Sequence, residues 1–140
     1  MRSLRRRFGL PAAHPGLAIL RFDGPLHFVN AATFEDAVLA VERDHPQLKV
    51  LLISSAGIND IDASGVDTLR RLRRQLAAGG RRLACCGLKK QVIDVLERTG
   101  LWAELGPHAA YRHEDDALPH LLPLLGAAPP PPPVRRGLEW

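Results

Sequence analysis

The chain has 140 residues, a formal net charge of +4 at pH 7 and 46% hydrophobic residues. These values are typical of one globular domain with a single core. Aromatic residues make up only 5% of the chain, whereas nucleic-acid-binding modules usually add stacking aromatic side chains to their basic patches. No run approaches the roughly 18 apolar residues of a membrane span. We therefore expect a soluble cytoplasmic protein that does not bind nucleic acid.

Composition divides the chain into three parts. Residues 1–14 contain a cluster of arginines followed by small residues, and we interpret them as a basic tail or linker. Residues 15–125 carry the apolar patterns of a folded domain. Residues 126–140 include five consecutive prolines at 129–133. Such a segment cannot pack into a core, so we expect a Pro-rich disordered tail.

The first half of the domain is predicted to open with a hairpin. Residues 17–23 read as a strand, the turn sequence Asp23-Gly24-Pro25 follows, and residues 26–29 predict a second, antiparallel strand. We expect Asn30 to cap the next helix through its side-chain oxygen. The side chains expected inside the core here are Phe22, Phe28, Phe34, Ala37, Val38 and Val41.

Strands and helices alternate in the second half. Residues 48–53 are an almost continuous apolar run, which is typical of a strand buried on both faces. The order predicts a mostly parallel sheet with right-handed crossovers. The further elements expected are a helix that ends at Gly79-Gly80, a strand at 83–86, a helix at 89–98, a weak strand around Tyr111 and a helix at 114–125.

The adjacent residues Cys85 and Cys86 are badly placed to form a disulfide with each other. Neighbouring residues of a strand point to opposite faces of the sheet. Their spacing matches no common zinc signature, and the six histidines form no i, i+4 pairs. We expect buried or half-buried thiols and no metal site.

The sequence INDIDASGVDTL, residues 58–69, leads from the buried strand into an arginine-rich helix. Ligands of open α/β sheets bind at this edge. However, Asp60 and Asp62 disfavour an anion at the helix start, and no glycine-rich phosphate motif is present. Ser64 lacks the local base of a nucleophile, and two carboxylates fall short of a calcium site. A helix start that is capped by Asp62 or Ser64 also explains the segment.

Three segments together resemble the STAS domains of SulP-type anion transporters. They are PGLAILRFDGPLHFVNA at 15–31, INDIDASGVDTL at 58–69 and VIDVLERTGL at 92–101. The resemblance covers residues 15–125. It implies an α/β fold with a mixed four- to five-stranded sheet and helices packed mainly on one side. It also implies a non-enzymatic regulatory or interaction domain, placed behind a transporter's membrane domain at the cytoplasmic face of the cell membrane.

The resemblance also implies a site and partners. The implied loop, which would bind a protein or a nucleotide, consists of Asn59, Asp60, Asp62, Ala63, Ser64 and Gly65, with a charged rim from Arg70, Arg71, Arg73 and Arg74 on the next helix. The implied partners are a transporter membrane domain in cis or in trans, an acyl carrier protein, a regulatory kinase and a second copy of the chain. No cofactor other than a nucleotide is implied.

STAS domains also occur as bacterial anti-sigma-factor antagonists, in which a serine directly after the loop aspartate is phosphorylated by a partner kinase. Ala63 occupies that position and has no hydroxyl, so Ser64 is the hypothetical phosphosite. Ser54 stands where transporter sequences often carry an aspartate. We predict the regulatory domain of a SulP-type sulfate transporter. The alternative is a free-standing anti-sigma-factor antagonist in a partner-switching pathway.

Overall fold

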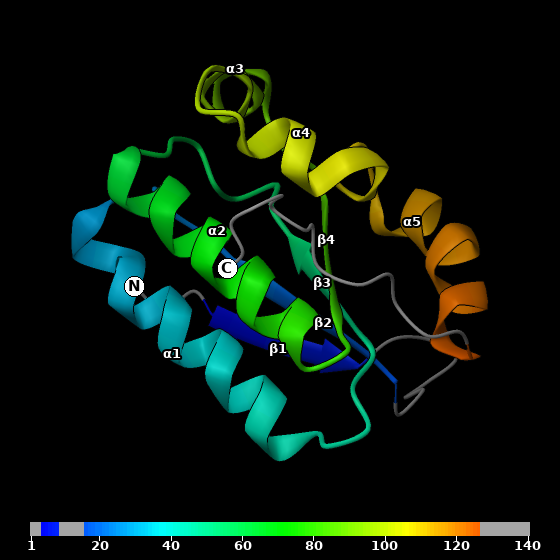
Figure 1. The fold of residues 1–140 in the computed structure, drawn as a ribbon. Helices are drawn as coiled ribbons and strands as arrows, with labels where there is room; N and C mark the ends of the chain where they lie inside the picture. Colours follow the sequence, from blue (N-terminus) through cyan, green and yellow to red (C-terminus); the bar gives the residue numbers. More distant parts are fainter. Residues whose placement is uncertain (1–3, 9–15, 127–140) are drawn as a thin grey trace, which may run out of the picture.

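The structure is a computed structural model that describes residues 4–8 and 16–126, and its centre is a four-stranded mixed sheet (Figure 1). The strands, in spatial order, are β1 (Leu4–Phe8), β2 (Leu17–Phe22), β3 (Val50–Ser54) and β4 (Arg82–Cys86). β1 is antiparallel to β2, whereas the β2–β3 and β3–β4 pairs are parallel. The mixed α/β fold class that the sequence predicts is confirmed.

Helices form both parallel crossovers. α1 (Phe28–Asp44) connects β2 to β3, and α2 (Ala63–Ala78) connects β3 to β4. The elements after β4 are α3 (Lys90–Arg98), α4 (Leu101–Leu105), the 3-10 turn η1 (Gly106–Ala109), α5 (Glu114–Leu121) and the 3-10 turn η2 (Leu122–Gly126). No helix within the described ranges is long and apolar enough to cross a membrane.

The core has two layers because β3 is buried on both faces. Its residues Leu51 and Ile53 pack into the layer formed by α1, α2, α3 and α4. Val50 and Leu52 face a smaller layer, which α5 closes with Ala117 and Leu121 and η2 closes with Leu125. Most helices therefore cover one face, as the sequence predicts, and α1 and α2 lie side by side across it (Figure 1).

The interpretation of residues 1–14 as a tail is wrong at residues 4–8, which form β1. This strand is the antiparallel partner of β2, with Leu4 opposite Phe22 and Phe8 opposite Ala18. An edge strand is held by backbone hydrogen bonds that any side chain permits, so a basic composition does not exclude it. The predicted tail at 126–140 lies outside the described residues from residue 127 onward.

The predicted strand at residues 26–29 is also wrong. Leu26 makes a single isolated bridge to Ile61, and α1 already begins at Phe28. Asn30 lies inside the first turn and does not cap the helix, because its side-chain amide donates to the Pro25 carbonyl at 2.7 Å. Phe28 is 76% exposed, whereas Phe22 and Phe34 are fully buried as expected. Of the three phenylalanines assigned to the core, one is therefore on the surface.

The segment from residue 100 to residue 126 is less regular than its apolar pattern suggests. Tyr111 forms only an isolated bridge to Cys86, and the helix predicted at 114–125 ends at Leu121 and continues as a 3-10 turn. The short helix α4 was not predicted. It follows Gly100, whose φ of +85° is a conformation that glycine adopts at little cost.

Cys85 and Cys86 are buried on opposite faces of β4, as predicted, and neither forms a disulfide. Burial raises the pKa of the Cys85 thiol to about 12, and the neighbouring Cys86 acts in the same direction. A thiol that stays protonated is a poor nucleophile and a poor metal ligand. Cys85 therefore acts as a small apolar core residue.

Candidate partner-binding surface

The loop between β3 and α2 is held in place by the segment that precedes α1. The Gly24 N–H donates to the Gly57 carbonyl at 2.7 Å, and the Leu26 N–H donates to the Asp60 carbonyl at 2.8 Å. The Asp62 N–H donates back to the Leu26 carbonyl at 3.3 Å. Two segments more than 30 residues apart in sequence therefore form one rigid edge, from which both α1 and α2 begin.

Asp62 caps both of these helices. Its Oδ1 accepts from the Gly65 N–H of α2 at 2.9 Å, and its Oδ2 accepts from the Phe28 N–H at the start of α1 at 3.0 Å. The hydrogen bond from Gly65 holds the pKa of Asp62 below its usual value against an opposing effect of partial burial. The Phe28 hydrogen bond and the charge of His27 act in the same direction as the Gly65 bond.

Replacing Asp62 with alanine is expected to lower the free energy of unfolding at pH 7 by about 1–2 kcal/mol, because both helices lose their cap. A carboxyl whose pKa is lower in the folded state stabilises the fold above its ordinary pKa, near 4. That stabilisation disappears as the pH falls through the folded pKa. Urea unfolding from pH 7 to pH 3 should therefore show the wild-type and Asp62→Ala curves converging in acid.

Asp36→Ala is the matched control, because Asp36 is an exposed carboxylate on the outer side of α1. We expect it to change the free energy of unfolding by less than about 0.5 kcal/mol. A gap between wild type and Asp62→Ala that stays constant down to pH 3 would contradict the double-cap role.

Gly65 is the point of closest approach between α2 and the edge. A Cβ atom at this position would lie 2.2 Å from the Leu26 carbonyl oxygen and 2.8 Å from Cγ1 of Ile61. The neighbour is the backbone that precedes α1. Gly65 thus sets how tightly the start of α2 sits against the start of α1.

The remaining loop residues are exposed or half-buried. Asn59, Asp60 and Ala63 are exposed, and Ser64 is half-buried at the second position of α2. Asp60 also contacts His27 across the edge, with Oδ2 at 2.9 Å from Nε2. Ser64 does not cap α2, because Asp62 fills that role.

Two apolar side chains that the sequence did not assign to a site lie on the same edge. Phe28 is 76% exposed and Val29 is 79% exposed, and between residues 16 and 125 no other large apolar side chain is exposed to this degree. Both belong to the first turn of α1, which Asp62 caps. The apolar stripe of α1, extended backward at 3.6 residues per turn, excludes both residues from the core.

The four arginines predicted as a charged rim are engaged within the domain. The Arg70 side chain pairs with Glu104 of α4 at 2.8 Å and donates to the Thr99 carbonyl at 2.8 Å. Arg73 donates to the Glu104 carbonyl at 3.2 Å, and Arg74 lies 3.5 Å from its carboxylate. Arg71 pairs with Glu35 of α1. These contacts fix α2 against its neighbours.

Residues 11–117 match the family model of the STAS domain, and the chain therefore belongs to the STAS domain family. A probable sulfate transporter of Mycobacterium tuberculosis is 29% identical over 93 residues, which cover 66% of this chain and 17% of the transporter. A probable sulfate transporter of Arabidopsis thaliana is 24% identical over 104 residues, covering 74% of this chain and 16% of the transporter. The chain thus spans about a sixth of the length of these relatives.

Solved structures of two kinds share the fold. A sulfate transporter family protein from Wolinella succinogenes has a TM-score of 0.71 at 25% identity and covers 86% of this chain and 93% of its own. An anti-sigma factor antagonist from Mycobacterium paratuberculosis has a TM-score of 0.67 at 21% identity, with coverages of 86% and 95%. The chain is a STAS domain related to sulfate transporters, and it shares its fold with anti-sigma factor antagonists.

Proposed function

We propose that this chain is a cytoplasmic regulatory domain that binds a protein partner and thereby tunes a SulP-type sulfate transporter. The contact surface comprises the loop 59–65 and the first turns of α1 and α2. The observation that carries the proposal is the exposed pair Phe28 and Val29 beside that loop. Exposed large apolar side chains next to a rigid polar edge are typical of interaction sites.

The charge of this surface defines the chemistry of the partner. Asp60 is exposed and contacts His27, which directly precedes the apolar pair. Asp67 is exposed on α2, and Arg71 of the same helix is neutralised by Glu35. A partner that offers an apolar pocket with a basic rim would complement this surface. A nucleotide is disfavoured as the occupant because its phosphates would meet the carboxylates of Asp60 and Asp62.

The transporter assignment rests on relatives that are sulfate transporters over the matched region. The domain would act either in cis, joined to a membrane domain, or in trans, beside one. The partner-switching alternative requires a phosphorylatable hydroxyl. Ala63 lacks one at the expected position, and a phosphate on Ser64 would lie close to Asp62, which raises its cost.

The test introduces aspartate at positions 28 and 29 by mutation of the native gene. Asp residues in the first turn of a helix are compatible with its dipole, so Phe28→Asp/Val29→Asp is expected to fold. We expect at least a twofold change in sulfate uptake by the cells, because a charged surface no longer enters an apolar pocket.

Gln47→Asp is the control, since it adds a carboxylate at an exposed site beyond the opposite end of α1. It is expected to leave sulfate uptake unchanged. Uptake that is equal in wild type and in the folded double variant would refute the proposed surface.

A further inference from the structure

A second site lies at the carboxyl end of β4. The structure contains a pocket of about 550 Å³ between the β4–α3 connection, α3, α4 and the segment before α5. This volume lies within the range of small-molecule sites. Ligands of open α/β sheets also bind at the carboxyl ends of the strands.

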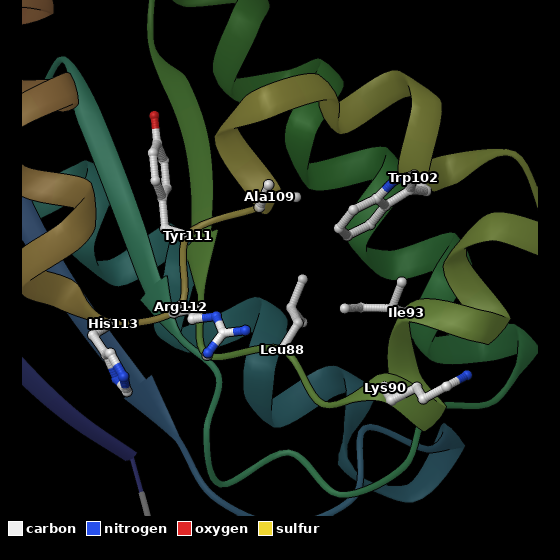
Figure 2. A pocket seen from close by; sticks show the side chains of 10 residues that line it. Leu88, Lys90, Ile93, Trp102, Ala109, Tyr111, Arg112 and His113 are labelled. Carbon is white, nitrogen blue, oxygen red and sulfur yellow. The ribbon is translucent and has the colours of Figure 1, made fainter.

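The walls of the pocket are apolar. The side chains of Leu88, Ile93 and Trp102 converge on the hollow, and Ala109 closes one end (Figure 2). Leu88, Ile93 and Trp102 are each only partly buried, so a ligand between them would remove further apolar surface from water. None of these side chains belongs to the proposed partner surface.

One cation is directed into the hollow. The Arg112 guanidinium lies beside Leu88, whereas the ammonium of Lys90 extends away from the pocket and pairs with Asp94 at 3.3 Å (Figure 2). Among the residues that the structure describes, Arg112 forms no ion pair. His113 points away from the hollow in the same view.

Contacts within the domain hold the walls of the pocket in place. Gly87, with φ of +76°, places its N–H 2.9 Å from the Tyr111 carbonyl and joins the two loops that form the floor. Arg70 and Arg73 bind Glu104 and hold α4, which carries Trp102, against α2. A pocket whose walls are fixed before binding loses little entropy when a ligand enters.

We propose that this pocket binds a small organic carboxylate with an apolar tail. The tail would lie between Leu88, Ile93 and Trp102, and the carboxylate would accept hydrogen bonds from the Arg112 guanidinium. The site would give the domain a small-molecule input that is separate from its protein-binding edge. This inference does not depend on the proposed transporter partner.

The test uses the fluorescence of Trp102. Trp140→Phe removes the other tryptophan of the chain, and the protein is titrated with butanoate, hexanoate and octanoate. We expect saturable shifts of the Trp102 emission and affinities that rise by up to about fourfold for each added methylene group. Octanol, which has the same tail and no charge, should bind about fivefold more weakly than octanoate.

Two variants locate the ligand. Arg112→Gln should bring the affinities for octanoate and octanol to about the same value. Arg43→Gln, at a remote exposed site on α1, should leave the preference for octanoate over octanol unchanged. Ile93→Gln should lower the affinity for both octanoate and octanol. Circular dichroism checks that each variant is folded. Trp102 emission that does not saturate, a charge preference that survives Arg112→Gln, or binding only to anionic phosphatidylglycerol vesicles would each overturn the proposal.

Discussion

Phe34→Ala is expected to lower the free energy of unfolding by about 3–5 kcal/mol, the usual range for removing a fully buried phenylalanine. Phe34 is 0% exposed in the layer between α1 and the sheet. Its ring meets that of Phe22 edge to face, with ring centroids 5.3 Å apart. The substitution leaves a cavity and also removes this aromatic contact. Urea unfolding followed by circular dichroism measures the loss.

Phe28→Ala is the matched control, because it makes the same change six residues earlier on the same helix. Phe28 is 76% exposed, so we expect the free energy of unfolding to change by less than about 0.5 kcal/mol. If Phe28→Ala costs as much as Phe34→Ala, the first turn of α1 is packed against the domain and the proposed surface does not exist.

Gly65→Ala is expected to lower the free energy of unfolding by about 1–3 kcal/mol, although alanine is the better helix former by about 1 kcal/mol. The added methyl group would overlap the Leu26 carbonyl oxygen, which is backbone and cannot rotate away. The start of α2 must then move away from the start of α1. That movement would stretch the two hydrogen bonds that Asp62 accepts.

Ser64→Ala provides the comparison at the neighbouring position. It adds no atoms, and we expect a change in the free energy of unfolding of less than about 0.5 kcal/mol. Backbone amide shifts should move on both helices in Gly65→Ala and only near residue 64 in Ser64→Ala. A Gly65→Ala protein as stable as the wild type would show that the two helix starts are not in close contact.

The elements with strong apolar periodicity could be predicted from the sequence. The helix predicted to end at Gly79-Gly80 is α2, which ends at Ala78, and the apolar run of β3 is buried on both faces as expected. Asp62 was one of two residues predicted to cap α2. Each of these predictions depends on local pattern, and tertiary contacts reinforce that pattern at these positions.

The features that escaped prediction depend on contacts between distant segments. The carboxylate that caps α1 comes from Asp62, 34 residues after Phe28, so no local motif marks that helix start. The predicted cap, Asn30, instead bonds to Pro25. The pocket lining comes from four separate segments, and Arg112 gives no sequence signal of its own. Three of the four rim arginines, Arg70, Arg73 and Arg74, contact Glu104, which lies on an unpredicted helix, so their intramolecular role could not be predicted.

Site-specific cross-linking tests the central claim most directly. A photoreactive phenylalanine analogue is placed at position 28 of the native protein in cells, and the same analogue at position 47 serves as the control. The account predicts an adduct from position 28, and not from position 47, that contains a component of the sulfate-transport system. Absence of an adduct at position 28, or equal adducts from both positions, would contradict the claim that this edge is the regulatory surface.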